Sequence, residues 1–172
     1  VEHDVIAGPS GLVVDLARTY RSDDAFVGSF GRGWMSVLDS RLDVAGDDIG
    51  CLTPDGEVTF VREEDGWHPV TPVDLVLVQV GRSFLVGRSD GRRMLFDARG
   101  RVAAVWDAAG RELRFGHEGE RVLSVRGADG GAATLERDGT GRITGMRDQG
   151  ELVATWRYED GLLVGASSGP GG

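Results

Sequence analysis

The sequence predicts an all-β protein: an antiparallel meander of hairpins that forms a curved or spiralling sheet and is able to roll into a partial shell or barrel. Turn glycines recur every nine to eleven residues from Asp55 onward. The short runs between them alternate between apolar and polar residues, as strands joined by tight hairpins do. The 28 glycines also leave no window with an unbroken helical pattern and a recognisable cap. With one wider interval around Gly81, these turn glycines are Gly56, Gly66, Gly91, Gly100, Gly110, Gly119, Gly130, Gly141, Gly150 and Gly161.

Residues 1–54 form a first zone, in which two alternating runs flank a segment rich in glycine and aromatic residues. Residues 11–21 alternate like a strand, and residues 35–44 resume the alternation. Between them, the glycines of residues 26–34 indicate a tightly bent segment where rings pack against closely approaching backbone. The residues that we expect to shape this entry region are Tyr20, Phe30, Gly31, Gly33, Trp34 and Leu42.

Residues 55–91 form a second zone of connecting hairpins. A strand at residues 57–61 precedes a proline-bearing loop at residues 67–72. The next run, residues 75–80, is apolar on both faces, so we expect it to be central in the sheet or covered by another layer. It is expected to pair across Gly81 with residues 82–86.

Residues 92–168 form a third zone, built from an internal repeat with steps of 20, 21 and 20 residues. Each unit has two apolar positions three residues apart, preceded by Arg in all units but the last, where Leu162 stands instead. We expect two strands per unit, including a strand over residues 130–137, and a frayed tail at residues 169–172, in one continuous structure. The predicted inner face consists of Val102, Val105, Val122, Val125, Ile143, Met146 and Leu163.

The repeat phrase from Phe96 to Gly110 resembles the YD repeat of the RHS family, with an aromatic residue, Asp, a short turn and Gly-Arg before the apolar pair. Upstream, residues 18–22, 30–34 and 38–42 are similar to the entry domain that precedes such repeats in bacterial polymorphic toxins. The repeats depart from the pattern at His117 and Glu118, at Leu135 and Glu136, and at Leu162.

The resemblance implies a function as a non-enzymatic structural scaffold, the start of a cocoon that encapsulates a C-terminal toxin in bacterial competition. It implies a secreted or cell-surface location, and partners that are further repeats or a toxin domain of the same or a longer chain. The resemblance thus implies a partial shell, which is either the opening turns of a longer β-spiral or a remnant that folds alone. An interrupted spiral leaves a strand edge open to self-association, and Arg157, Glu159 and Asp160 are candidates to blunt that edge.

Composition argues against several other partners. The formal net charge of −9 repels phosphate backbones, so nucleic acid is not an expected partner. No apolar run is long enough for a spanning helix, which argues against membrane insertion. The single cysteine, Cys51, forms no intramolecular disulfide, and we expect it on a half-buried strand position.

The search for reactive or ligand-binding residues predicts no catalytic, cofactor or metal site. None of the three histidines lies in a motif: His3 is at the terminus, His68 in a loop and His117 in a hairpin turn. The acidic clusters at residues 23–24, 47–48 and 63–65 do not have calcium-loop spacing. The alternative to a scaffold is a carbohydrate- or protein-binding surface module, which would use an open sheet edge or exposed tryptophans among Trp34, Trp67, Trp106 and Trp156.

Overall fold

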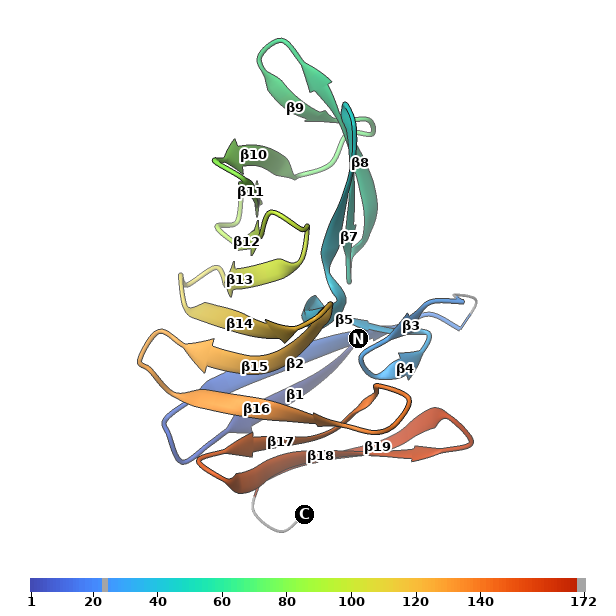
Figure 1. Cartoon of the computed structure of the whole chain (residues 1–172), viewed down its shortest axis with the longest axis vertical. Coiled ribbons are helices and arrows are strands. Elements are labelled where there is room, and N and C mark those ends of the chain that lie inside the picture. Colours follow the sequence, from blue (N-terminus) through green and yellow to red (C-terminus); the bar gives the residue numbers. More distant parts are fainter. Residues whose placement is uncertain (23–24, 170–172) are drawn as a thin grey trace. The chain divides into compact units, whose positions relative to one another are not determined.

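The computed structural model describes residues 1–22 and 25–169, and it confirms the all-β prediction. The described residues form 19 strands and one helical element, a short 3₁₀ turn, η1, at Val37–Asp39 (Figure 1). Within the described residues, no helix has the length and apolar character that a membrane span requires. The predicted acidic cluster at residues 23–24 and the last three residues of the predicted tail lie outside the described residues.

The strands follow the turn signals of the sequence. In chain order they are β1 (Glu2–Ala7), β2 (Val13–Tyr20), β3 (Val27–Gly28), β4 (Gly31–Arg32), β5 (Trp34–Ser36), β6 (Arg41–Ala45), β7 (Asp48–Thr53), β8 (Gly56–Glu63), β9 (Gly66–Pro69), β10 (Val76–Val80), β11 (Ser83–Gly87), β12 (Arg93–Phe96), β13 (Val102–Trp106), β14 (Glu112–Glu118), β15 (Arg121–Gly127), β16 (Ala132–Arg137), β17 (Ile143–Asp148), β18 (Glu151–Glu159) and β19 (Leu162–Ser168). The segment at residues 130–137 is thus a strand, as predicted, and the predicted loop at residues 67–72 is corrected, because β9 extends to Pro69.

The main sheet is a meander in which spatial order equals chain order. Its 14 strands run from β6 to β19, with each strand bonded to the next in sequence, so β6 and β19 are its two ends. A second sheet has the order β1-β2-β5, and β3 pairs with β4 in a small ribbon. Neighbouring strands pair antiparallel throughout the registers of the main sheet that the structure describes.

The chain divides into two compact units. One consists of Val1–Asp39 with Phe115–Gly172, and the other of Ser40–Arg114. The predicted boundaries at residues 54 and 91 separate zones with different sequence patterns, whereas these units are defined by their contacts. The predicted boundaries therefore stay a prediction.

The first unit has its core where strand β1 lies against β18 and β19. The alternation of β1 and β2 directs one side chain in two inward, and Ile6, Val14 and Leu16 are buried. Phe30 from the bent entry segment is fully buried and meets Trp156 of β18 edge to face, with ring centroids 5.3 Å apart. The entry segment and the last repeats therefore share one core.

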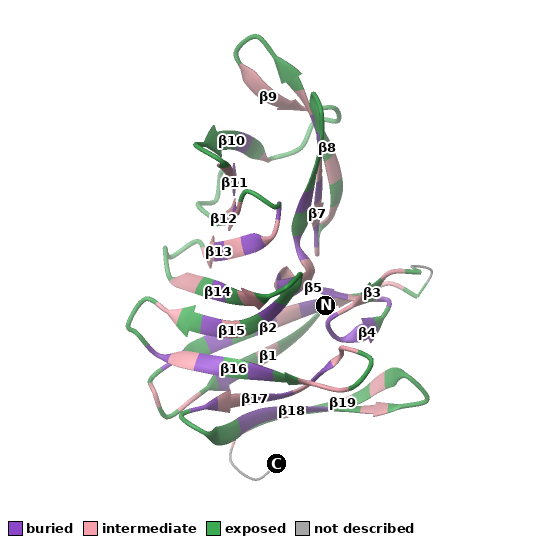
Figure 2. Cartoon of the chain, viewed as in Figure 1, coloured by how far each residue is buried: buried purple, intermediate pink, exposed green. Residues whose placement is uncertain are grey.

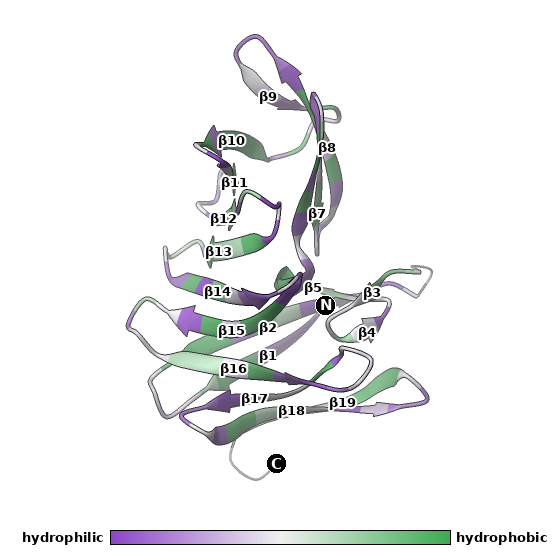
Figure 3. Ribbon diagram, in the orientation of Figure 1, coloured by the Kyte–Doolittle hydropathy of each residue, from purple (hydrophilic) through white to green (hydrophobic). Residues whose placement is uncertain are grey.

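The second unit buries Ile49, Cys51, Phe60 and Phe96 completely. Its strand β10 pairs with both β9 and β11, which confirms the prediction of a central strand. Only Leu77 of β10 is buried, however, while three valines on its other face, Val76, Val78 and Val80, are exposed. This apolar but uncovered strand is visible by comparing Figure 2 with Figure 3.

In three of the four repeat units, a β-bulge explains why the apolar positions are three residues apart. In a regular strand, residues i and i+3 point to opposite faces. The register of β17 against β16 skips Thr144, directly after Ile143, and that of β19 against β18 skips Val164, directly after Leu163. The register of β13 against β12 skips Ala103, directly after Val102. One extra residue reverses the alternation beyond it, so both Ile143 and Met146 are buried.

Candidate functional site

The repeat phrase forms a hairpin turn that its own Asp and Arg side chains close. At Asp97, the main-chain N–H donates to the Arg101 carbonyl at 2.9 Å, and the Gly100 N–H donates to the Asp97 carbonyl at 2.9 Å. Gly100 has a φ of +77°, which glycine adopts at little cost. This is a three-residue hairpin loop, a type I turn followed by a residue in the left-handed region.

Both oxygens of the Asp97 carboxylate are used inside this turn. Oδ1 accepts the N–H groups of Arg99 and Arg101 at 2.9 and 3.0 Å. Oδ2 accepts Nε and Nη2 of Arg101 at 2.9 and 2.7 Å, a bidentate pair. The spacing of Asp and Arg therefore has a structural reason: Asp binds the turn backbone, and Arg, four residues later, closes the ring.

A similar arrangement occurs at Asp107 with Arg111, which pairs through Nε, and at Asp138 with Arg142, which pairs through Nε and Nη2. In the second case, Thr140 adds a hydroxyl donor at 2.7 Å to Asp138 Oδ1. Its hydrogen bond lowers the pKa of Asp138, and burial opposes that effect only partly. A hydrogen bond from the Arg111 main chain lowers the pKa of Asp107. Burial raises the pKa of Asp97, but the hydrogen bonds and charge of Arg101, with the hydrogen bond from Arg99, together bring it below its ordinary value.

Three further segments have this backbone turn without the full set of side chains. Residues 8–12, 88–92 and 127–131 each show the same two main-chain hydrogen bonds. Each has a glycine with positive φ in its fourth position: Gly11 at +85°, Gly91 at +91° and Gly130 at +92°. In the last two, the carboxylate moves to the third position, at Asp90 and Asp129, and caps the fifth residue. The turn therefore tolerates loss of its salt bridge, but in all six copies the glycine is kept.

Arg142 also links its turn to the following hairpin. Its guanidinium carbon lies 4.5 Å from the centroid of the Tyr158 ring. The Tyr158 hydroxyl donates to the Ile143 carbonyl at 2.7 Å, and burial raises the pKa of Tyr158 to about 12. One repeat back, the Arg121 guanidinium lies against Gly141, where an added Cβ would be 2.6 Å from its Cζ. The arginine of one repeat thus packs on the turn or aromatic residue of the next.

The predicted entry residues have different environments. Four of them are buried: Phe30, Gly31, Gly33 and Leu42. Trp34 is half-buried. Tyr20 is exposed, and the centroid of its ring lies 5.0 Å from that of the Trp34 ring. Gly33 has a φ of +75°, and a Cβ there would be 2.7 Å from the Arg21 carbonyl oxygen. In the other unit, Leu42 N–H donates to the Gly100 carbonyl at 2.8 Å.

The predicted inner face is largely buried. Val102, Val122, Val125, Ile143 and Met146 have exposed fractions of 2% or less. Val105 and Leu163 are only half-buried.

Two polar side chains that sequence reasoning did not single out bind main-chain groups, Asp39 in the entry region and Arg137 in the repeats. Asp39 accepts the Ser29 N–H at 2.7 Å and the Ser36 N–H at 2.9 Å. Arg137 of β16 donates to the carbonyls of Gly141 and Val122 at 2.7 and 3.0 Å, and burial lowers its pKa. Each of these bonds uses main-chain partners, which a residue pattern alone does not reveal.

Asp148 binds the turn at residues 8–12 to the repeats. It is fully buried at the end of β17, and its Oδ2 accepts the Ser10 hydroxyl at 2.6 Å and the Ser10 N–H at 3.2 Å. Gly8 passes so close that a Cβ there would be 1.9 Å from the same oxygen. This contact joins residues that are 138 positions apart in the chain.

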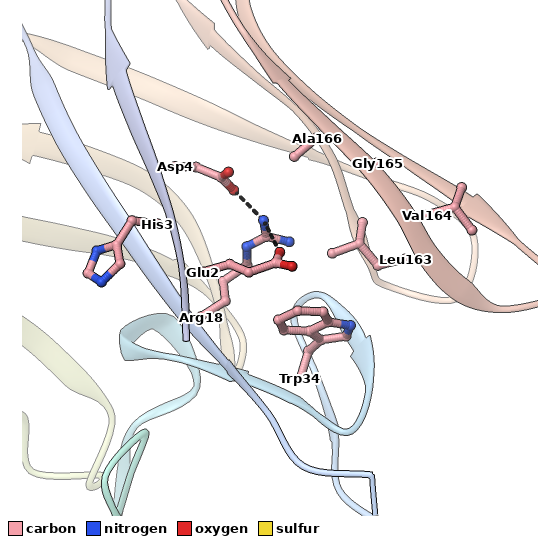
Figure 4. Close-up of a pocket in the computed structure, with 9 residues that line it drawn as sticks. All are labelled: Glu2, His3, Asp4, Arg18, Trp34, Leu163, Val164, Gly165 and Ala166. Atoms are coloured by element: carbon pink, nitrogen blue, oxygen red, sulfur yellow. Dashed lines mark hydrogen bonds and ion pairs between the residues drawn. The ribbon is translucent and has the colours of Figure 1, made fainter.

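Arg18, also missed by sequence reasoning, is the most buried charged group at an open cavity of about 460 Å³ (Figure 4). Its side chain is 1% exposed, and its Nη2 pairs with Asp4 at 2.8 Å and with Glu2 at 3.2 Å. The guanidinium lies 5.1 Å from the centroids of both Phe30 and Trp34. Asp4 also accepts the Trp156 Nε1–H at 2.9 Å, so its carboxylate is held from two sides.

The histidines are placed differently from the prediction. His3 is in β1 and His68 in β9, whereas His117 is in β14 rather than in a hairpin turn. His68 Nε2 lies 2.7 Å from Asp65 Oδ1, and together with Glu63 these residues bring three possible metal ligands within 4.8 Å of one another. All three lie at the surface of one hairpin, and nothing else at this cluster points to a bound ion.

Cys51 is fully buried in β7, and burial raises the pKa of its thiol to about 12. A thiol held protonated in the core is a packing group and not a nucleophile. The residue is more deeply buried than the predicted half-buried strand position.

The fold and its turns define an open, antiparallel β-meander whose repeat residues serve hairpin closure. Residues 2–60 match the model of a protein family described as a domain of unknown function, DUF6531. The matched segment covers β1 through most of β8, about a third of the chain. Among curated proteins, none matches the chain.

Proposed function

We propose that this chain is a structural β-scaffold module without catalytic activity, similar to the opening part of an RHS shell that encapsulates a C-terminal toxin in bacterial competition. The turn closed by Asp and Arg is the observation that carries this proposal. The charged residues of the phrase that resembles the YD repeat have their hydrogen-bonding capacity used within their own hairpin, as at Asp97 and Arg101. They therefore hold a sheet together and are not available for acid–base chemistry.

Contacts between successive hairpins support the same role. Arg121 against Gly141 and Arg142 on Tyr158 each join one repeat unit to the next. An array stabilised through such nearest-neighbour contacts is extended by adding units. This favours further repeats or an enclosed toxin domain of the same or a longer chain as partners, and it agrees with a secreted or cell-surface protein.

The sequence of the whole encoded polypeptide tests the proposal. We expect more repeat units in which an arginine precedes the apolar pair at about 20-residue steps, as at Arg101 and Arg121, followed by a protease segment and a toxin. Expressed by itself, that C-terminal segment should stop bacterial growth, and linked to the repeats it should do so less. An adjoining domain of another kind, or a C-terminal segment without toxicity, would contradict the encapsulating role.

The carbohydrate-binding alternative finds less support in the tryptophans. Trp156 is buried, and each of the three half-buried indoles has an arginine over its ring: Arg18 on Trp34, Arg62 on Trp67 and Arg93 on Trp106. A ring face that is covered by a guanidinium is not free for a sugar. We expect a glycan array and tryptophan-fluorescence titrations at millimolar sugar to show no saturable binding.

A further inference from the structure

Strands β10 to β13 carry an apolar surface on the face of the sheet opposite to the buried Leu77. Residues that lie opposite each other in neighbouring antiparallel strands have their side chains on the same face. By these registers, Val78 shares its face with Leu85, and Leu85 shares it with Leu95. The large apolar side chains of this face are Val76, Val78, Val80, Leu85, Leu95 and Trp106.

This apolar surface lies in the middle of the main sheet and not at one of its ends. Each of its four strands has a hydrogen-bonded neighbour on both sides, with β9 next to β10 and β14 next to β13. Further repeats after β19 would extend the sheet at its end and would add no neighbour to these strands. An occupant of the surface therefore meets side chains and no open main-chain edge, which is how an amphipathic helix is recognised.

The surface is locally basic, although the whole chain is acidic. Residues 76–96, which contain β10, β11, β12 and the turns between them, include four arginines and one aspartate, in a chain with a net charge of −9. Two of the arginines pair with carboxylates of the chain. The other two, Arg82 and Arg93, are exposed and have no carboxylate partner in the part of the chain that the structure describes.

These two arginines lie at opposite ends of the row of valines. Arg82 is in the turn between β10 and β11, two residues after Val80. Arg93 is on the face itself, in the cross-strand row that runs from Val76 through Gly87. Carboxylates placed beside an apolar stripe on a partner would thus find a guanidinium at either end.

At the Val76 end, the surface opens into a cavity of about 620 Å³. Val76 and Arg93 line this cavity, and the small residues 108–110 leave room in it for a large side chain. Asp74, the one carboxylate of the lining, already accepts the main-chain N–H and the hydroxyl of Ser89 at 3.1 and 2.8 Å. The charge that remains open to a partner here is that of Arg93.

We propose that this surface is a docking site for an amphipathic helix of a partner protein, with acidic side chains beside its apolar stripe. Four neighbouring strands about 4.8 Å apart give a surface about 15 Å wide, enough for a helix about 10–12 Å in diameter. The apolar stripe covers Val78 and Leu85, one large side chain enters the cavity, and the carboxylates bind Arg82 and Arg93. Burial of the exposed valines drives the association, and the arginines select the acidic partner.

The test uses the whole chain and a fluorescein-labelled peptide that, as a helix, has one leucine stripe flanked by glutamates. Its sequence is Glu-Leu-Glu-Ala-Leu-Leu-Glu-Ala-Leu-Glu-Ala-Leu-Leu-Glu-Ala-Leu-Glu-Ala. Fluorescence anisotropy should give saturable binding with a dissociation constant of about 10–500 µM, because the peptide is ordered on binding. The same peptide with Lys in place of Glu should bind about tenfold more weakly. The net charge of −9 alone would favour the Lys peptide, so a preference for Glu reports on the local arginines.

Matched substitutions localise the binding. Val78 and Val44 are strand residues of the same unit and are 48% and 49% exposed. Val78→Glu should weaken binding of the Glu peptide by more than about tenfold, since it places a like charge on the surface, while Val44→Glu should leave binding unchanged. Both variants should keep the thermal unfolding transition, because both positions are exposed. Arg82→Gln should weaken binding about threefold, as expected for an exposed charge pair.

Thiol labelling shows where the peptide lies. Cys51 is fully buried, so a cysteine introduced at an exposed position is the one that reacts with a thiol reagent. In Val76→Cys, the reaction should slow when the Glu peptide is added. In Val44→Cys, the rate should not change.

Four results would overturn the proposal: no saturable binding up to millimolar peptide, equal or tighter binding of the Lys peptide, full binding by Val78→Glu, and unchanged labelling of Val76→Cys. A chain that sediments as a dimer, with the thiol of Val76→Cys already protected, would assign the surface to a second copy instead. Cosedimentation with phosphatidylserine vesicles that Val78→Glu abolishes would assign it to a membrane. The proposal does not depend on the scaffold function, since that function is tested by the encoded polypeptide and this surface by peptide binding.

Discussion

The guanidinium of Arg142 lies over the ring of Tyr158, with 4.5 Å between its central carbon and the ring centroid. The same guanidinium also binds Asp138: its Nη2 and Nε lie 2.7 and 2.8 Å from Asp138 Oδ2. One arginine thus closes its own turn and supports the next hairpin. A substitution at this position should therefore affect two repeats at once.

Removing the turn carboxylate tests this arrangement. Asp138→Ala should lower the free energy of unfolding by about 1–2 kcal/mol, because several charge-assisted hydrogen bonds are lost from one turn. Asp107→Ala is the control: its turn has the same backbone hydrogen bonds, but Ala109 stands where Thr140 binds Asp138, and Arg111 is 81% exposed. Urea denaturation should show a clearly smaller loss for Asp107→Ala, and equal losses would show that the Thr140 bond and the contact of Arg142 with Tyr158 add nothing.

The turn carboxylates also predict a dependence of stability on pH. Hydrogen bonds lower the pKa of Asp97, Asp107 and Asp138 in the folded chain below the ordinary value of 3.8. A carboxyl with a lower pKa in the folded state binds fewer protons there than in the unfolded state, so its stabilisation is complete above about pH 5 and is lost as pH falls through 4 and below.

The melting temperature should accordingly fall between pH 5 and pH 2. In Asp138→Asn, which cannot titrate, the fall should be smaller, while the melting temperature at pH 7 should lie below that of the parent chain. Circular dichroism melts at five or six pH values in constant salt measure both effects. If the two proteins show parallel pH profiles, Asp138 does not contribute to acid sensitivity.

The sequence predicts the repeat well because its signals are local. Asp97, Gly100 and Arg101 form a turn whose hydrogen bonds join residues at most four positions apart, so their spacing is visible in the chain. The repeat also predicts that apolar positions three residues apart, such as Ile143 and Met146, share one face, although the bulge that places them there is seen only in the strand register.

The entry region and the cavity depend on contacts between distant residues. Asp148 binds Ser10, and Asp4 binds the Trp156 indole across 152 positions. No local pattern distinguishes Arg18, which is buried, from Arg21, three residues later. The valines of β10 show a second reason why sequence prediction fails: an apolar strand does not reveal whether another layer covers it, and these valines are exposed.

Adjacent residues of β15 test the inner face of the repeats. Val122 is 2% exposed and Leu123 is 42% exposed, as alternation along a strand requires. Val122→Asp places an unpaired charge in the core and should unfold the chain or cost more than about 3 kcal/mol. Leu123→Asp should change stability by less than about 1 kcal/mol. A normal melting transition for Val122→Asp would contradict the assignment of the inner face.

A methyl group at Gly8 tests the contact between the turn at residues 8–12 and Asp148 of the repeats. The added Cβ would lie 1.9 Å from Asp148 Oδ2 and 2.7 Å from Asp148 Cβ, so Gly8→Ala must displace a fully buried carboxylate and break its bonds to Ser10. The cost should be about 2–3 kcal/mol, in the range of overpacking a core. Gly139→Ala is the control, since no atom lies within 4 Å of its Cβ position. It should be neutral or stabilising by up to about 1 kcal/mol, through a less flexible unfolded chain.

Chemical denaturation of both variants gives the comparison, and hydrogen exchange shows where the structure opens. In Gly8→Ala, the amides of β1 and of the turn at residues 8–12 should exchange faster, while those of β7 and β8 in the other unit should not change. If the two glycine variants are equally stable, the contact between Gly8 and Asp148 does not hold the entry region to the repeats.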